Sequence, residues 1–505
     1  MIYSFNRALG WASSGVEYAQ SYRARLFARL GWPARFVFTD FFPTENIEHY
    51  ARNLGFLDEE VIWLYSYFTD YPIEPTTYRR ENLEASFGQT PLKVARHGGF
   101  LRYTLSRIFY VDAFLRRGTE DVILRCDYVF QGHLTRRDFY TSGLLFSEHY
   151  VHVPSPEEGG EGKDVLSLRV FFNRDGTEAL SEVMGEKGSL FRVGKEIFDS
   201  KERFLEYFIR SLRLTEEDMI LLDRSTDIGQ AVLAAHGRAL LGCVVHADHY
   251  SPDSPNPDHI LWNNFYEYAL THARDFDFFI CSTEEQSSLL ARHLEEETGS
   301  VGAKIVTIPV GSLEELILPD APRLPFSLCT CSRLAPEKHV DYLVEAVCEA
   351  RETVPEITLD IYGTGSEEAT LRELIAQKKA EGYVHLMGHR DLSGVYVKYS
   401  AYASASTSEG FGLTLMEAAG SGLPLVGYDV RYGNQAFIED GGNGYLVPFA
   451  GESDRRERVK ALSAALVRLF TEADLGAFSS RSYEMAEPYL TIHVMQQWKS
   501  LREGL

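Results

Sequence analysis

Two basic residues in the C-terminal half of the chain are spaced as a phosphate-binding pair would be. Arg333 and Lys338 lie five residues apart in SRLAPEKHVDYL, a segment that follows an apolar strand pattern and opens a helical one. Two cations together with the free N–H groups of a helix N-terminus can hold a diphosphate, and they stabilise the charge that grows on it as it departs. A solvated basic loop would contain the same residues, so this segment alone leaves both interpretations open.

A more specific pattern follows in SEGFGLTLMEAAGSGLPLVG. Glu409 and Glu417 are eight residues apart, and Gly410 and Gly412 lie between them at a predicted strand-to-helix turn. Glycines allow backbone amides to approach a ligand, while a carboxylate accepts hydrogen bonds from sugar or ribose hydroxyls. Two glutamates alone could be a helix cap and a surface charge. Together with the two upstream cations, they indicate a site for a sugar nucleotide.

Two histidines lie at the end of another predicted strand. In CVVHADHYS, His246 ends the strand and His249 is on the loop that follows. A lone histidine is usually structural, and no third ligand accompanies these two, so a metal site is not expected here. Either residue could contact a ligand at this strand end.

Two further segments carry weaker candidates. The loop GWASSGVEYAQ has Gly15 at a predicted helix start, where Ser13 or Ser14 could cap the helix. In VHLMGHRDL, Gly388 and His389 end a strand, and a plain turn is the alternative there. Neither segment alone indicates a ligand.

Short apolar strands that alternate with helices must position these residues. The N-terminal part reads MIYSF, a Gly/Ser loop, a helix over about 16–30 and RFVFTD; the alternation resumes with DMILLDR, GCVVHAD, DFFICST and KIVTIPV. From about residue 326 it returns with FSLCTCSR, TLDIYG, VHLMG, YASAS, LPLVGYD and GYLVPF. This pattern predicts two facing doubly wound α/β domains with ligands at the carboxyl ends of parallel strands.

The hydrophobic periodicity changes between the two N-terminal parts of this pattern, where apolar and polar residues alternate at period two. Asp175 and Gly176 separate two such runs, which is a hairpin signal because glycine tolerates the positive φ of a tight turn. We therefore predict an antiparallel β-sheet inserted over 41–214. The first α/β domain is expected over 1–40 and 215–315, and the second, nucleotide-sugar-binding domain over 316–480. A C-terminal helix over 481–505 is expected to pack back on the first domain.

The composition excludes several classes of protein. At 505 residues the chain is too long for a single core, and its net charge of −23 argues against nucleic acid or an anionic membrane as the main partner. No apolar run is long enough to span a membrane, and the first residues do not resemble a signal peptide, so we expect a cytoplasmic protein. The six cysteines are scattered among apolar patterns, which favours buried free thiols over disulfides or zinc ligands.

The charged segments resemble those of retaining glycosyltransferases of the GT-B fold that share a Glu-x7-Glu motif. The resemblance implies that Arg333 and Lys338 bind the pyrophosphate of a UDP-sugar, so that no metal or other cofactor is needed. It implies that Glu409 lies against the donor sugar and that Glu417 binds the ribose. Other residues that it assigns to UDP or the sugar, with His246 preferred to His249 beside the sugar, are Gly15, Val16, Glu17, Tyr18, His246, Gly388, His389, Gly410, Phe411 and Gly412.

A narrower resemblance covers nearly the whole chain. GWASSGVEYAQSYRA, ILWNNFYEY, TIPVGS and TSEGFGLTLMEA, with the inserted sheet, are similar to the catalytic subunits of accessory-Sec-linked glycosyltransferases of Gram-positive bacteria. This implies transfer of N-acetylglucosamine from UDP-N-acetylglucosamine to Ser and Thr of serine-rich repeat adhesins, the first step of their O-glycosylation. It also implies a related, non-catalytic partner subunit that stabilises the enzyme, and peripheral association with the cell membrane.

Three alternatives remain at this stage. Glucose could replace N-acetylglucosamine, because one substituent separates them. The acceptor could be teichoic acid or another polysaccharide, although the mixed charge of the insertion favours a polypeptide over a polyanion. A non-catalytic subunit that binds glycoproteins would keep the fold but lose the donor site, whereas all four charged residues are intact here.

Overall fold

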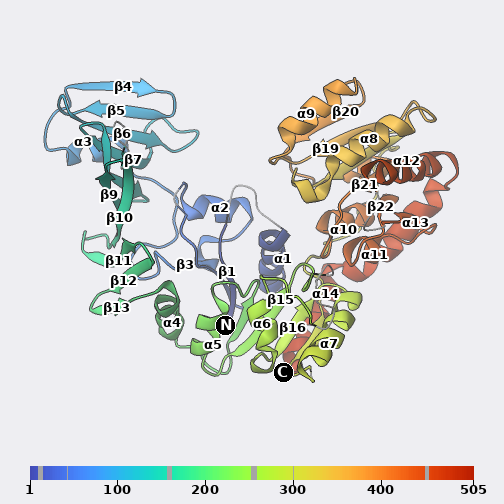
Figure 1. The fold of residues 1–505 in the computed structure, drawn as a ribbon, viewed down its shortest axis with the longest axis horizontal. Helices are drawn as coiled ribbons and strands as arrows, with labels where there is room; N and C mark the ends of the chain where they lie inside the picture. Colours follow the sequence, from blue (N-terminus) through green and yellow to red (C-terminus); the bar gives the residue numbers. More distant parts are fainter. Residues whose placement is uncertain (10–14, 43, 156–161, 252–258, 300, 450–453) are drawn as a thin grey trace. The chain divides into compact units, whose positions relative to one another are not determined.

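The computed structural model describes residues 1–9, 15–42, 44–155, 162–251, 259–299, 301–449 and 454–505. Ser13 and Ser14, the predicted helix caps, lie outside these ranges. The chain divides into two compact units (Figure 1). The first comprises Met1–Trp11 and Trp32–Leu241, and the second comprises Ala12–Gly31 and Gly242–Leu505.

Four parallel strands form the base of the first unit. They lie in the order β14-β1-β2-β3, and most of their residues are buried, as expected for strands covered by helices. Phe5, Phe36 and Phe38 are fully buried on them. The bounds of the strands and of the nearby helices are β1 (Ile2–Asn6), β2 (Ala34–Phe38), β3 (Val61–Trp63), β14 (Met219–Leu222), α2 (Ile47–Asn53), η1 (Asp58–Glu60), α4 (Lys201–Ser211) and α5 (Gly229–Ala235).

A ten-stranded antiparallel sheet makes up the rest of the first unit. Its strands pair in chain order, and Gly176 turns with a φ of 82° between β10 and β11, which confirms the predicted hairpin. The strands and the adjoining helix are β4 (Lys93–His97), β5 (Phe100–Thr104), β6 (Phe109–Leu115), β7 (Ile123–Phe130), β8 (His133–Tyr140), β9 (Leu144–Val153), β10 (Lys163–Phe172), β11 (Glu178–Gly185), β12 (Gly188–Val193), β13 (Glu196–Phe198) and α3 (Arg80–Ser86).

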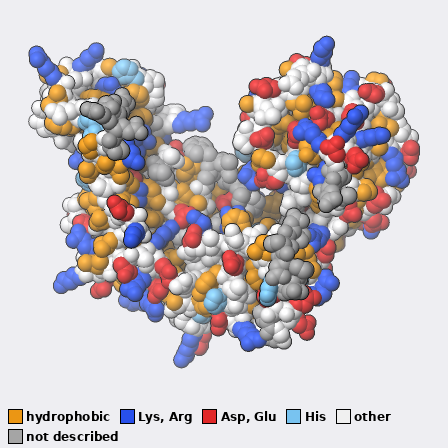
Figure 2. All heavy atoms as spheres, in the orientation of Figure 1, with side chains coloured by type: hydrophobic (Ala, Val, Ile, Leu, Met, Phe, Trp, Pro, Cys, Tyr) orange, Lys and Arg blue, Asp and Glu red, His pale blue; other side chains and the backbone are white. Residues whose placement is uncertain are grey.

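The antiparallel segment begins later than residue 41, the predicted start of the insertion. β3 lies inside the range 41–214 but pairs in parallel with β2. A strand of three residues is too short to show a period, so the sequence could not separate it from the insertion. Figure 2 shows apolar side chains exposed among charged ones in the region of the antiparallel sheet. The exposed apolar residues on its strands include Val151, Val165, Val183 and Ile197.

The second unit contains the remaining parallel strands. β15, β16 and β17 pair side by side, and six further strands form a sheet in the order β20-β19-β18-β21-β22-β23. These bounds are β15 (Leu240–Val245), β16 (Phe278–Cys281), β17 (Lys304–Thr307), β18 (Ser327–Cys331), β19 (Thr358–Tyr362), β20 (Val384–Gly388), β21 (Ala401–Ser404), β22 (Leu425–Tyr428) and β23 (Gly444–Val447). Parallel α/β sheets with an antiparallel insertion confirm the predicted fold class.

Helices of the second unit cover both of its sheets. α7 shows why they start and stop where they do: Thr283 caps its first turn by accepting from the Gln286 N–H, and Gly299 ends it with a φ of 73°. The helices are α1 (Gly15–Leu30), α6 (Glu267–Thr271), η2 (Ala273–Asp275), α7 (Glu284–Thr298), η3 (Pro336–Lys338), α8 (Val340–Ala350), α9 (Glu368–Gln377), η4 (Tyr396–Lys398), α10 (Leu413–Gly420), α11 (Gly433–Phe437), α12 (Arg455–Thr471), α13 (Leu475–Ala486), η5 (Glu487–Tyr489) and α14 (Thr491–Glu503).

The C-terminal segment forms two helices where one was predicted over 481–505. The break falls at η5, because Pro488 has no N–H to continue α13. α14 then packs on α1, where the Trp498 and Phe27 rings meet edge to face with centroids 4.9 Å apart. The six cysteines are free thiols, and all but Cys348 are buried. None of the helices in the described ranges is both long and apolar enough to cross a membrane.

Candidate donor-sugar site

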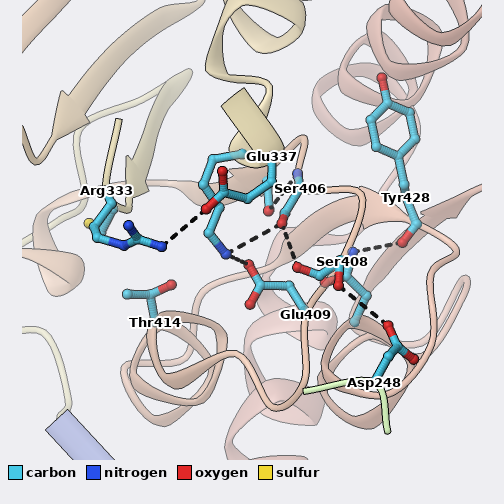
Figure 3. A network of polar contacts seen from close by, with 12 residues as sticks. Asp248, Arg333, Glu337, Ser406, Ser408, Glu409, Thr414 and Tyr428 are labelled. Carbon is cyan, nitrogen blue, oxygen red and sulfur yellow. Dashed lines mark hydrogen bonds and ion pairs between the residues drawn. The ribbon is translucent and has the colours of Figure 1, made fainter. Parts of the chain in front are cut away.

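Lys338 and Glu409, 71 residues apart in sequence, form an ion pair in the second unit (Figure 3). Lys338 ends η3, which follows β18, and its Nζ contacts Glu409 Oε1 and, at 3.4 Å, Ser406 Oγ. Both side chains are more than four-fifths buried. Arg333 lies on the same loop, where its Nη2 donates to Glu337 Oε1 at 3.0 Å, and it is 44% exposed. The structure thus brings Lys338 into contact with Glu409. Arg333, the other predicted cation, stays at the surface.

The loop Glu409–Gly412 is held by backbone contacts. The Gly433 N–H donates to the Glu409 carbonyl at 2.9 Å. A Cβ on Gly410 would lie 2.0 Å from the His246 carbonyl oxygen, and Gly412 adopts a φ of 84° just before α10. These glycines therefore allow the loop to lie against the end of β15, which is a structural role. The predicted contact of their backbone amides with a ligand stays a prediction.

Phe411 in this loop is a core residue. Its ring is 3% exposed and packs edge to face on Phe437, with Tyr489 also in contact. The side chain cannot stack on a sugar without leaving the core. Only the backbone of Phe411 can serve the sugar-binding role expected for it.

Glu417 lies in α10 with both carboxylate oxygens engaged. Oε1 accepts from the Tyr22 hydroxyl at 2.6 Å, and Oε2 accepts from the Tyr396 hydroxyl at 2.8 Å. Burial raises the pKa of Glu417, and these two hydrogen bonds oppose the rise. Each oxygen keeps a second lone pair, so a ribose hydroxyl could still donate to it.

The start of α1 lies near this carboxylate. Gly15 opens the helix, the Val16 and Glu17 side chains are buried, and Tyr18 is 40% exposed. Burial raises the pKa of Tyr18, and the charge of Glu417 raises it further. Of these predicted UDP-binding residues, Tyr18 is the one whose side chain is open to solvent.

The ends of β18, β19 and β20 lie side by side. The Gly363 N–H after β19 donates to the Gly388 carbonyl at 2.9 Å, and the Ser332 N–H donates to the Tyr362 carbonyl at 3.0 Å. Gly388 has a φ of 69° and His389 is exposed. These two residues thus share an edge of the sheet with the Arg333 loop, as parallel strands require.

The two histidines after β15 differ sharply. His246 is half-buried. Its backbone N–H donates to the Tyr266 hydroxyl at 2.9 Å, and its backbone carbonyl lies against Gly410. His249 is fully buried, and its Nε2 lies 2.9 Å from His293 Nδ1. Burial, with the charges of His293 and Arg431, lowers the pKa of His249 to about 3. His249 is therefore a neutral core histidine, and His246 is the one beside the Glu409 loop.

Asp248, between these histidines, was missed in the sequence. Its Oδ2 accepts from Ser408 Oγ at 3.4 Å, next to Glu409 (Figure 3). Its Oδ1 is buried and has no hydrogen bond of ordinary geometry in the described part of the chain. Burial raises the pKa of Asp248, and the nearby Arg431 opposes this. The available signal was a carboxylate two residues after His246 at the same strand end.

Comparisons with known proteins place this arrangement in a class. The family model described as "Glycosyl transferases group 1" matches residues 325–472, which contain Arg333, Lys338, Glu409 and Glu417. The model "GtfA extended beta-sheet domain" matches residues 93–209, which span the antiparallel sheet. The fold is thus that of a group 1, GT-B-type glycosyltransferase, and the matched residues include the four charged side chains described above.

Full-length relatives make the assignment narrower. The GtfA subunit of UDP-N-acetylglucosamine–peptide N-acetylglucosaminyltransferase from Streptococcus pneumoniae is 44% identical over 504 residues, 99% of each chain. The corresponding subunit of Streptococcus gordonii is 43% identical over 502 residues, 99% of this chain and 98% of the relative. This chain belongs to the family of these GtfA subunits.

Solved structures agree with this membership. The pneumococcal O-GlcNAc transferase GtfA in complex with UDP and GlcNAc superimposes with a TM-score of 0.94 at 44% identity, covering 100% of this chain and 98% of that one. A GtfA/B complex matches with a TM-score of 0.90 at 43% identity, covering 100% and 99%. The structure of TarM, 19% identical with a TM-score of 0.77 over 99% and 98%, shares the fold.

Proposed function

We propose that this protein transfers N-acetylglucosamine from UDP-N-acetylglucosamine to Ser and Thr hydroxyls of a polypeptide. The observation that carries the proposal is the Lys338–Glu409 pair, built into a chain that aligns end to end with a GtfA solved with UDP and GlcNAc. Serine-rich repeat adhesins, which the sequence resemblance implies as acceptors, are the proposed polypeptides. Glycosylation of the unmodified adhesin would then be the first step.

The proposed chemistry relies on positioning and charge. Arg333 and Lys338 hold the diphosphate and stabilise UDP as it leaves, so the proposal includes no metal ion at this step. Glu409 and the half-buried His246 orient the sugar, and Glu417 orients the ribose. The acceptor hydroxyl attacks on the face that the diphosphate leaves, and a diphosphate oxygen takes its proton, so the configuration at the anomeric carbon is retained.

A partner subunit is part of the proposal. A GtfA relative has been solved as a GtfA/B complex, and this chain matches its whole length. The apolar side chains exposed on the antiparallel sheet, such as Val151, Val165 and Ile197, are suited to an interface. We place the assembly in the cytoplasm, with any membrane contact made peripherally through the complex.

The test is release of UDP by the purified chain, with and without its co-expressed partner. UDP-N-acetylglucosamine and UDP-glucose are each offered with a Ser/Thr-rich repeat polypeptide, with poly(ribitol phosphate), or with no acceptor. Mass spectrometry of the polypeptide reports the added sugar and its residues. Retention is read from the anomeric proton of the product by NMR.

We expect release that depends on the polypeptide and on N-acetylglucosamine. Glu409→Ala should abolish it, whereas Glu373→Ala, an exposed glutamate on α9, should not change it. Release that depends only on poly(ribitol phosphate) would replace the polypeptide with a teichoic acid as acceptor. If neither donor gives UDP release in the presence of the partner, the protein would instead be a non-catalytic subunit that binds glycoproteins.

A further inference from the structure

Two histidines and an aspartate gather at one end of the antiparallel sheet. His133 opens β8, His152 lies next to last in β9, and Asp164 is second in β10. Asp164 is directly opposite His152. The register of β8 and β9, which pairs Arg136 with His149, continues to place His133 opposite His152 on the other side. Residues paired in this way point to the same face of a sheet, so three neighbouring strands present one row of ligand groups.

The three side chains lie close enough together to ligate one metal ion, and His152 is hydrogen-bonded to Asp164 in this arrangement. The Nδ1 atoms of His152 and His133 lie 2.9 Å and 3.3 Å from Asp164 Oδ1. The possible ligand atoms all lie within 4.8 Å of one another, and no other such group of three occurs in the described residues. Nitrogen and oxygen ligands about 2.0–2.2 Å from a tetrahedral zinc ion are separated from each other by about 3.3–3.5 Å. A metal ion could therefore bind with small adjustments of the side chains.

The groups around the cluster hold its ligands in place. The Leu134 N–H donates to Asp164 Oδ2 at 2.8 Å, which leaves Oδ1 toward the two rings. Gly162 lies so close to His152 that a Cβ there would be 2.6 Å from the ring and 2.5 Å from the Val153 carbonyl. The His133 and His152 rings, with centroids 3.8 Å apart, are 45% and 33% exposed, so an ion can enter from solvent.

We infer that His133, His152 and Asp164 form a binding site for a divalent transition metal ion. Two imidazoles and one carboxylate fit Zn²⁺ best, with water completing a tetrahedron, whereas Mg²⁺ and Ca²⁺ prefer all-oxygen sites. The ion would join the ends of β8, β9 and β10 and so stabilise that end of the sheet. None of the residues assigned to sugar transfer lies on these strands. The sequence hides the site because its ligands are 19 and 12 residues apart.

The test uses the full-length chain without a polyhistidine tag, stripped with EDTA and dialysed. Zn²⁺, Co²⁺ and Mg²⁺ are titrated by calorimetry, bound metal is counted after gel filtration, and the Tm is followed against Zn²⁺ concentration. The visible spectrum of the Co²⁺ form reports tetrahedral coordination. His133→Ala, His152→Gln and Asp164→Asn are compared with His97→Asn, an exposed histidine elsewhere on the same sheet.

We expect one Zn²⁺ per chain, a Tm that rises with Zn²⁺, and no response to Mg²⁺. Loss of an outer-shell partner typically weakens metal affinity about 10–100-fold, and each variant that removes a ligand should weaken Zn²⁺ binding by more than this. His97→Asn should bind Zn²⁺ as the parent does. Circular dichroism of the metal-free variants separates loss of the site from loss of the fold. Equal Zn²⁺ binding by parent and His152→Gln, or none by the parent, overturns the inference and leaves a hydrogen-bonded His–Asp cluster.

Discussion

Lys338 and Glu409 form a largely buried ion pair, and this pairing has a consequence for the proposed binding of the donor. If Lys338 holds the diphosphate as proposed, the diphosphate must compete with the Glu409 carboxylate for Lys338 Nζ. That exchange would release Glu409 to accept a hydrogen bond from the sugar. The proposal therefore predicts that recognition of the sugar is coupled to recognition of the phosphates.

Lys338→Ala tests this role. Turnover should fall by roughly two to three orders of magnitude, because a donor that stabilises the leaving group is lost. The measurement is kcat and kcat/KM for UDP-N-acetylglucosamine, with Tm to verify folding. Arg372→Ala, which removes a surface cation paired with Glu368 one turn away, is the matched control. Turnover near the parent value in Lys338→Ala would remove Lys338 from the site.

Asp248 is expected to bind a sugar hydroxyl through its buried Oδ1, which has no hydrogen bond of ordinary geometry in the described residues, although the Tyr432 hydroxyl interacts with the same carboxylate. Asp248→Asn should lower kcat/KM about 10- to 100-fold, since a hydrogen bond to a charged group contributes about 1.5–3 kcal/mol. The Kd for UDP alone, measured by calorimetry, should stay unchanged. Ser408→Ala removes only the partner of Oδ2 and serves as the control. An equal loss of UDP affinity would assign Asp248 to the nucleotide instead.

His249 makes the second unit sensitive to acid. Its pKa is lowered from near 6.5 in the unfolded chain to about 3 in the folded one, mainly by burial. Above pH 6.5 the contribution of neutral His249 to the free energy of unfolding is fully present. It is lost as the pH drops from 6.5 toward 3, because in this range the unfolded chain binds the proton and the folded chain does not. At pH 5 the loss is about 2 kcal/mol. Calorimetric unfolding of His249→Gln should show a smaller drop in Tm between pH 7 and pH 5 than the parent or His97→Asn.

At the scale of residues, sequence identified the charged groups but not their contacts. Glu409 and Lys338 were chosen as candidates because glycines and predicted strand ends mark their segments, whereas the preference for His246 over His249 came from the family resemblance. The pairing of Lys338 with Glu409 and the contact of Asp248 with Ser408 depend on loops whose paths no local pattern fixes. The burial of the Phe411 ring, which leaves only its backbone for the predicted sugar contact, was not predicted, because a phenylalanine in a glycine-rich turn gives no signal of which way its ring points.

At the scale of elements, the turn between β21 and α10 sets the geometry of the site. Its glycines let the chain pass within van der Waals distance of the end of β15. The alternating strand and helix patterns predicted these elements, because buried parallel strands are continuously apolar. The short β3 and the break at η5 were not predicted, since a three-residue strand has no period and α13 and α14 read as one helix across Pro488.

Gly410→Ala tests the turn directly. The added Cβ would overlap the His246 carbonyl, so the Glu409 loop must move, and a misplacement of about 1 Å can lower turnover about 100-fold. Kinetics of UDP release provide the measurement. Gly382→Ala is the control, because a Cβ there meets nothing within 4 Å. If the two variants turn over donor equally well, the close approach at Gly410 has no part in catalysis.

At the scale of the whole molecule, the order of the chain does not follow the division into units. Residues 12–31 belong with 242–505, while the flanking residues belong to the first unit. α1 is held in the second unit by Tyr22 on Glu417 and by Phe27 on Trp498. The Tyr22–Glu417 hydrogen bond and the packing of the last helix therefore act on the same helix, α1.

Trp498→Ala should destabilise the second unit by about 3–5 kcal/mol, the usual cost of emptying a buried tryptophan site. The ring is 5% exposed, whereas Ile492 on the same helix is 65% exposed, so Ile492→Ala is the control. Denaturant unfolding followed by circular dichroism measures both. UDP should restore part of the lost stability if α1 and the donor site are coupled through Glu417. A Trp498→Ala chain as stable as the control would show that α14 is dispensable.

The contact between Phe27 and Trp498 also delays the packing of α1 until the end of the chain has been synthesised. The two residues are 471 positions apart, which a ribosome covers in roughly 25 to 95 s at about 5–20 residues per second. During that interval the nascent α1 has emerged but lacks the helix that covers Phe27. The first unit can begin to fold meanwhile, with α1 left as an apolar loop between its first two strands. A nascent-chain chaperone that shields α1 until translation ends would suit this order of assembly.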